Sequence, residues 1–195
     1  MATYLAFQGS SPNNTFKTWN NIQDSSPSNL DLLDEDGVSS GYGYSSNPVP
    51  GTAPFGADSV GTGDASWVDE SEIMRWGHYT GSSTAFKFFG PAGESVDIEF
   101  CSSMPAGRQT RVIVGSESYT FPDVERSTSA TYIFVGATFN VDGEISGAWE
   151  QATSGSSYIM AARITESAPS APNTPINPSI TNLLAASARL NWEQG

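Results

Sequence analysis

The sequence is poor in the side chains from which most enzyme sites are built. Among its 195 residues there is one cysteine, Cys101, and one histidine, His78. No internal disulfide can form, and this pair cannot complete the nitrogen and sulfur ligands of a zinc site. Hydrolytic nucleophiles need an adjacent base, yet the sequence has no Gly-x-Ser-x-Gly turn and no glycine-rich phosphate loop followed by lysine. We therefore expect no catalytic residues and no enzyme activity; the remaining alternative is glycoside hydrolysis by paired carboxylates such as Asp97 and Glu99.

Basic residues and long apolar runs are also scarce. Eight Lys and Arg residues stand against 21 Asp and Glu residues, which gives a net charge of −13. Nucleic acid and anionic membranes repel such a surface. No run approaches the ~18 apolar residues of a membrane helix, and residues 1–7 lack the basic and apolar regions of a signal peptide. We expect no nucleic-acid partner, no membrane insertion and synthesis in a cytoplasm, unless an export signal was removed. A divalent cation, a neutral glycan or a protein surface stays open as a partner, and the charge is otherwise explained by solubility.

Short alternating segments dominate what is present. Residues 96–101 alternate between apolar and polar side chains, which is the period of a half-buried strand. Asp142-Gly143 between two such runs predicts a tight β-hairpin, and residues 30–46 read as two strands around the acidic turn 34–37. The other expected strands are 3–8, 84–89, 95–102, 110–115, 117–121, 130–139, 143–149 and 157–165.

These strands predict an all-β fold, an antiparallel jelly-roll β-sandwich over residues 1–166. One short helix is expected near 70–76, with a capping box formed by Asp69 and Glu72. Residues 167–179 carry four prolines and are expected to be an extended linker. Residues 180–195 then form a separate strand segment or an assembly arm.

Several short motifs occur in a fixed order along residues 3–166. They are Phe7-Gln8-Gly9, Trp19-Asn20-Asn21, Asn29-Leu30, Asp36-Gly37, Ser40-Gly41, the helix before Trp76, Arg108 and Arg111 before 112–115, 141–145, and 158–164. In this order they resemble the galactose-binding-like and malectin-like jelly rolls, which occur as accessory modules of carbohydrate-active enzymes and in phage virion proteins. Residues 169–192, with Pro169, Pro172 and the run Ala188-Arg189-Leu190-Asn191-Trp192, resemble the first two strands of a fibronectin type III domain. The assembly-arm candidates are Pro172, Ile180, Leu183, Leu190 and Trp192.

Two kinds of binding site are candidates. A glycan site would need an exposed aromatic ring and nearby polar groups, and we name Trp67, Tyr79, His78 and Tyr44, with core packing as the alternative. The carboxylates of Asp31, Asp34 and Asp36 are hard oxygen ligands suited to a structural calcium, which the jelly-roll resemblance permits; the alternative is a solvated acidic turn.

The function expected from these observations is structural or binding rather than catalytic. The first hypothesis is a surface component of a tailed-phage virion, such as a capsid decoration, fibre or tail-associated protein. It would assemble in the host cytoplasm with other virion proteins or its own copies as a homo-oligomer, and it could contact a cell-surface glycan. The alternative is a carbohydrate-binding module of a larger secreted, glycan-active enzyme, which would place the chain outside the cell.

Overall fold

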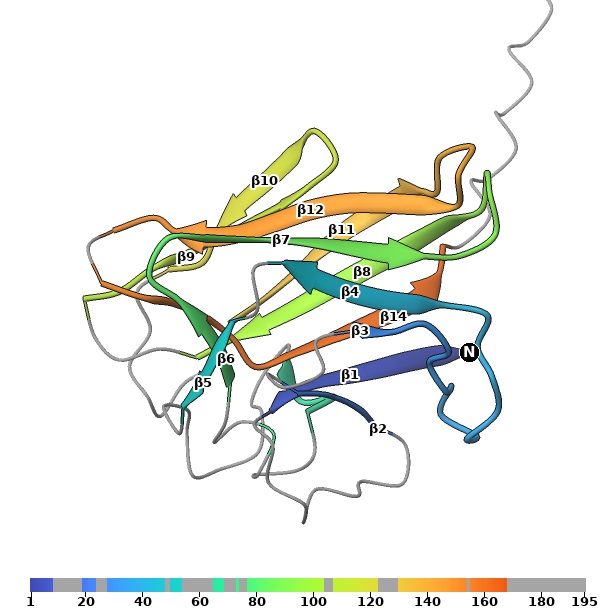
Figure 1. The fold of residues 1–195 in the computed structure, drawn as a ribbon, viewed down its shortest axis with the longest axis horizontal. Helices are drawn as coiled ribbons and strands as arrows, with labels where there is room; N and C mark the ends of the chain where they lie inside the picture. Colours follow the sequence, from blue (N-terminus) through green and yellow to red (C-terminus); the bar gives the residue numbers. More distant parts are fainter. Residues whose placement is uncertain are drawn as a thin grey trace, which may run out of the picture.

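The computed structural model is an all-β sandwich of two sheets, mostly antiparallel, and confirms the predicted fold class (Figure 1). The C-terminal arm and most of the predicted helix lie outside the described residues; of residues 70–76, only Ile73 is described, and it is helical and buried. The structure describes residues 1–8, 19–23, 28–47, 50–53, 65–68, 73, 77–103, 107–122, 130–153 and 155–167.

The first sheet has five strands in the order β11-β8-β14-β1-β2. All its pairs are antiparallel except β1 with β2. Its strands are β11 (Ala130–Thr138), β8 (Ser95–Ser102), β14 (Ala161–Glu166), β1 (Ala2–Gln8) and β2 (Trp19–Gln23).

The second sheet has six strands in the order β10-β9-β12-β7-β4-β3, and three short strands, β13-β6-β5, form a third sheet. The six are β10 (Glu117–Thr120), β9 (Thr110–Val114), β12 (Glu144–Gln151), β7 (Ser83–Phe89), β4 (Gly43–Asn47) and β3 (Ser28–Asn29). The three are β13 (Ser157–Ile159), β6 (Gly77–Thr80) and β5 (Gly51–Ala53).

The core lies between the two large sheets and is rich in aromatic rings. The inward side chains of β8 include Phe100, which meets Phe86 and Phe88 of β7 with ring centroids 5.5 and 6.2 Å apart. All three are buried. Burying a side chain of this size stabilises a fold by roughly 1.5–3 kcal/mol, so the alternation read from the sequence identifies the residues that hold the sheets together.

Three features of the fold differ from the sequence-based expectations. The strands β2, β5 and β6 were not predicted, and the expected strand 157–165 is two strands, β13 and β14, in different sheets. They separate at Met160, whose N–H donates to Cys101 and whose carbonyl accepts from Phe7. The turn at Asp142-Gly143 exists, but the predicted β-hairpin is wrong, because β11 and β12 pair with strands of opposite sheets.

Candidate functional site

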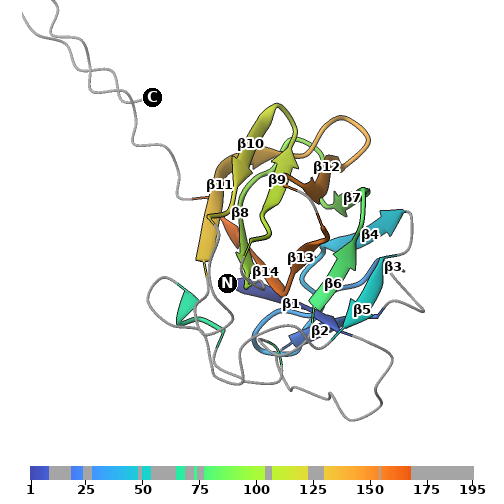
Figure 2. The ribbon, with the colours of Figure 1, turned by 90° about the vertical axis from the view of Figure 1, so that its left-hand side faces the viewer.

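Two edge strands come together on one side of the sandwich (Figure 2). β11 ends the five-stranded sheet and β10 ends the six-stranded sheet. The rings of Tyr119 (β10) and Tyr132 (β11) stack with centroids 3.8 Å apart, and the Tyr132 hydroxyl donates to Glu117 Oε1 at 2.7 Å. Hydrogen bonding to this carboxylate raises the pKa of Tyr132. These contacts join the two edges along part of their length.

Farther along, β11 bends away at a β-bulge. Its register with β8 shifts between Phe134 and Ala137, and Gly136 has a φ of 68°, a conformation that favours glycine. The Gly136 N–H donates to Asp97 Oδ1 at 2.9 Å, which holds the bulge against β8. The bulge leaves Val135 72% exposed at the edge.

The turn after β11 forms the next wall. Asn140 Oδ1 accepts hydrogen bonds from the N–H groups of Asp142 and Glu144, each at 2.9 Å, and Gly143 has a φ of 73°. A side chain at Gly143 would collide with the Gly90 carbonyl. This fixed turn carries the chain across from one sheet to the other and places Glu144 at the start of β12.

Between these elements lies a cleft of about 410 Å³, which we call the rim cleft. Its floor includes the buried residues Val114, Phe134 and Ile145, and its walls carry two carboxylates, an amide and several hydroxyls. The lining residues are 114–117, 134–138, Asn140 and 144–146.

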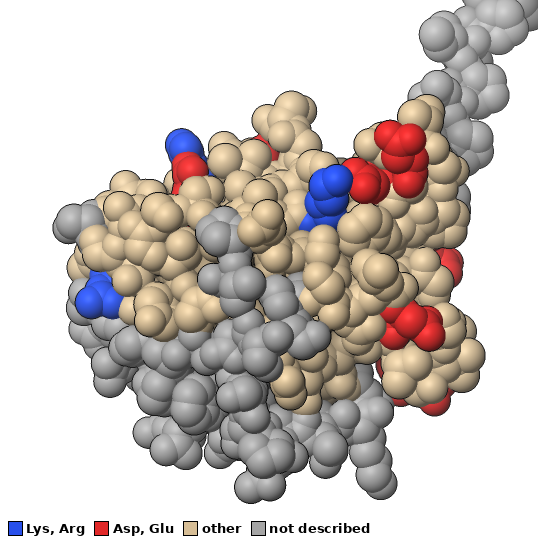
Figure 3. Space-filling model, in the orientation of Figure 1, with Lys and Arg blue, Asp and Glu red and all other residues tan. Residues whose placement is uncertain are grey.

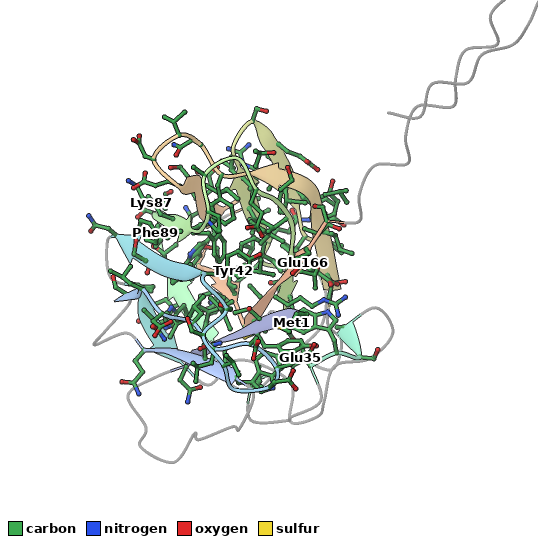
Figure 4. All side chains as sticks on the ribbon, turned by 90° about the vertical axis from the view of Figure 1, so that its right-hand side faces the viewer. Met1, Glu35, Tyr42, Lys87, Phe89 and Glu166 are labelled. Atoms are coloured by element: carbon green, nitrogen blue, oxygen red, sulfur yellow. The ribbon has the colours of Figure 1, made fainter. Side chains whose placement is uncertain are left out.

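The electrostatics of the rim cleft are set by Glu117 and Glu144, since no Lys or Arg is among the lining residues. Glu117 accepts from Tyr132, and Glu144 Oε2 pairs with Lys87 Nζ at 2.7 Å. Lys87 lies outside the cleft, at the periphery of the molecule (Figure 4). The cleft thus offers carboxylate acceptors and hydroxyl groups beside the exposed side chain of Val135.

The sequence-predicted aromatic residues lie elsewhere and are not gathered into one site. Trp67 is half-buried; its ring stacks on Trp19 at 5.9 Å, with the guanidinium carbon of Arg163 5.0 Å from its centroid. Tyr79 of β6 is also half-buried, 6.0 Å from the ring of Tyr158. Neither lines the rim cleft.

The other two predicted ligand residues belong to the core. Tyr44 is 1% exposed and packs against Phe7 and Phe88 at 5.4 and 5.3 Å, and His78 is 0% exposed beside Phe7. A sugar ring cannot stack on a side chain that has no surface, so the core-packing alternative describes both residues in this structure.

The acidic turn is organised by backbone hydrogen bonds. Asp34 is 3% exposed, and its Oδ1 accepts from the N–H groups of Asp36 and Val38 at 2.9 and 3.0 Å. Asp31 Oδ1 instead accepts from the Ser39 hydroxyl at 2.6 Å. The described part of the chain has no group of three or more His, Cys, Asp or Glu side chains placed to hold a metal ion. A calcium site that also uses backbone carbonyls at this turn stays a prediction.

The predicted assembly-arm residues Pro172, Ile180, Leu183, Leu190 and Trp192 lie outside the described residues. Over the ranges that are described, no helix is long and apolar enough to cross a membrane. The sequence analysis did not predict the rim cleft. Gly136 and the Asp142-Gly143 turn are the features of the sequence that lie in or beside it, but only the sheet order shows that β10 and β11 are neighbouring edges.

No protein-family model and no curated protein matches this sequence. Solved structures match it distantly. A carbohydrate-binding module in complex with β-1,4-galactotriose is 11% identical with a TM-score of 0.38, over 65% of this chain and 89% of that chain. The protein YxiM from Bacillus subtilis (11% identity, TM-score 0.49) and a plant complex of RALF23 with FER and LLG2 (10%, 0.48) each match over 85% of this chain. The chain spans 40% of the length of each of these two.

Domains of glycan-active enzymes, including a family two carbohydrate esterase from Cellvibrio japonicus, are also among the similar structures. The comparisons show a distant structural similarity to carbohydrate-binding modules and malectin-like domains, which agrees with the predicted resemblance at the level of the β-sandwich.

Proposed function

We propose that this β-sandwich is a non-catalytic carbohydrate-binding module whose ligand site is the rim cleft. The observation that carries the proposal is the composition of that cleft. Its volume of about 410 Å³ lies within the range of small-molecule sites. Carboxylates and hydroxyls can bond sugar hydroxyls, which both donate and accept, and the exposed side chain of Val135 in the lining suits the C–H face of a sugar ring.

The chemistry of the remaining groups supports a module without catalysis. His78 and Cys101 are both fully buried, and burial raises the pKa of the Cys101 thiol, so it holds no reactive thiolate. The alternative carboxylate pair is occupied by structural contacts. Glu99 is 3% exposed and bonded by Arg163 Nε at 2.6 Å, and Asp97 accepts from the Gly136 N–H.

The virion component predicted from the sequence stays a prediction. No observation on the described residues favours it over a glycan-binding module, and its supporting arm segment lies beyond them. Self-association, contact with other virion proteins and the location in a virion are untested in the same way. For a module of a secreted enzyme, an extracellular location follows as part of the proposal.

The direct test is binding of neutral oligosaccharides to the full chain on a glycan array, followed by calorimetric titration. Hydrogen bonds to charged groups contribute about 1.5–3 kcal/mol each, so Glu117→Gln and Glu144→Gln are each expected to weaken binding about tenfold or more. No cleavage products of the bound glycan are expected after prolonged incubation with the protein.

The matched control is Glu150→Gln, because Glu150 also lies on β12 but pairs with Arg111 (Nε to Oε1, 2.7 Å) outside the cleft. The affinity of the Glu150→Gln variant for the glycan should equal that of the unchanged protein. The proposal fails if no neutral glycan binds, or if Glu117→Gln and Glu144→Gln bind as tightly as the control.

A further inference from the structure

A second hollow lies on the outer face of the six-stranded sheet, and we call it the sheet hollow. Its volume is about 300 Å³, and it crosses the strands β12, β7 and β4. The face seen in Figure 3 also carries acidic and basic side chains in contact. The lining residues are Ser45, Ser46, Asn47, Ala85, Phe86, Lys87, Ser146 and Gly147.

Small outward side chains create the sheet hollow. In register across three strands, Ser45 lies beside Lys87 and Lys87 beside Ser146, and the neighbouring row begins with Asn47 beside Ala85. Apart from Lys87 and Asn47, these side chains are too short to cover the backbone. Phe86 also lines the hollow but is 2% exposed, so the surface open to a ligand belongs to the small outward side chains and to Lys87.

The sheet hollow adjoins the rim cleft along β12. Ser146 lines both, so one exposed hydroxyl stands at the junction. The ion pair between Lys87 and Glu144, 2.7 Å between charged atoms, joins them as well, since Lys87 lines the sheet hollow and Glu144 lines the rim cleft. Both partners keep exposed surface and so can also bond a ligand.

We propose that the rim cleft and the sheet hollow form one continuous groove that binds an internal stretch of a neutral, linear oligosaccharide rather than a single terminal sugar. This inference rests on the proposed function. From β12 to β4 the hollow spans two strand spacings, or roughly 10 Å, which is longer than one sugar ring. Uronic acids are disfavoured, because the two carboxylates of the rim cleft repel them.

Calorimetric titration of the full chain with a length series of the bound glycan, from monosaccharide to hexasaccharide, tests the groove. Affinity is expected to rise at least tenfold between the shortest ligand that binds and the longest. In the double variant Ser45→Ile/Ala85→Ile, rigid β-branched side chains occupy the sheet hollow and suit a strand. This variant should keep the affinity for the shortest ligand and lose the gain with length.

The control is Thr120→Ile, an exposed position on β10 of the same sheet that lines neither hollow. It should keep the gain with length, and thermal unfolding checks that all variants are folded. Affinity that does not depend on length, or a length gain that survives in the double variant, overturns the groove and leaves the proposed function standing. Absence of binding to every neutral glycan overturns both.

Discussion

Buried hydroxyl and thiol groups predict that this protein loses stability at alkaline pH. Burial is the main cause that raises the pKa of Tyr44 and of Cys101 above their ordinary values of 10.0 and 9.0. The pKa of Tyr42 rises for the same reason, and its hydrogen bond to Glu94 adds to the effect. The folded state therefore binds these protons more tightly than the unfolded chain does.

These raised pKa values make the free energy of unfolding depend on pH. A raised folded-state pKa contributes stability that is fully present below the unfolded value and is lost as the pH rises toward the folded one. We predict that the free energy of unfolding falls steadily above pH 9.0–10.0, and that the fall is shallower in Tyr44→Phe. Urea unfolding at a series of alkaline pH values measures it. Deprotonation of every tyrosine near pH 10.0 in a protein that stays folded would contradict this prediction.

Among the secondary-structure elements, β12 shows how closely the sheets are packed. Gly147 lies on the face of β12 that points into the sandwich, between the inward side chains of Ile145 and Trp149. A Cβ at this position would collide with the Phe86 ring and with the backbone carbonyl of Ile113, which cannot move without breaking the β9–β12 pairing.

Gly147→Ala is therefore expected to destabilise the fold by about 1–3 kcal/mol, the usual cost of overpacking a core. Urea unfolding measures the change. Gly81→Ala is the matched control, because a Cβ at Gly81 has nothing within 4 Å and should leave stability nearly unchanged. Equal stability of the two variants would show that the interior around Phe86 is looser than described.

The sequence predicted the strands with a clear period and missed those held by special contacts. β8 contains the alternating run 96–101, and Val96, Ile98 and Phe100 of that run are core as the period predicts. Its other face is buried as well from Glu99 onward, which the period did not predict. β2 has no such run; Asn20 supports it by donating to the carbonyls of Tyr4 and Leu33 and accepting from the Leu33 N–H. Side-chain bonds of this kind, which add to the parallel pairing of β2 with β1, have no periodic signal in the sequence.

The predicted hairpin at Asp142-Gly143 is wrong because the local sequence does not determine which sheet the next strand joins. A turn sequence determines the local reversal of the chain, and here the Gly143 N–H bonds the Asn140 carbonyl as expected. It does not determine whether the following strand returns to the same sheet. In this sandwich β12 crosses to the second sheet, and that crossing opens the rim cleft.

For the whole molecule, the proposed binding site depends on which strands are edges. Glu117, Gly136 and Ser146 are far apart in sequence and ordinary in type, and they meet because β10 and β11 end their sheets on the same side. The aromatic residues predicted as ligand contacts do not line this cleft, since large rings such as Tyr44 are needed in the core. The strand pattern of the sequence predicted the fold class, and the sheet order was needed to identify the proposed site.

The measurement that tests the account most directly is nuclear magnetic resonance mapping of the backbone amides during titration with a neutral oligosaccharide. We predict saturable shifts confined to the rim cleft and the adjoining sheet hollow, led by Gly115, Gly136, Glu144 and Ser146, with no change around the buried His78. Shifts centred on another surface, or none with any neutral glycan, would contradict the claim that this sandwich binds carbohydrate between its two edge strands.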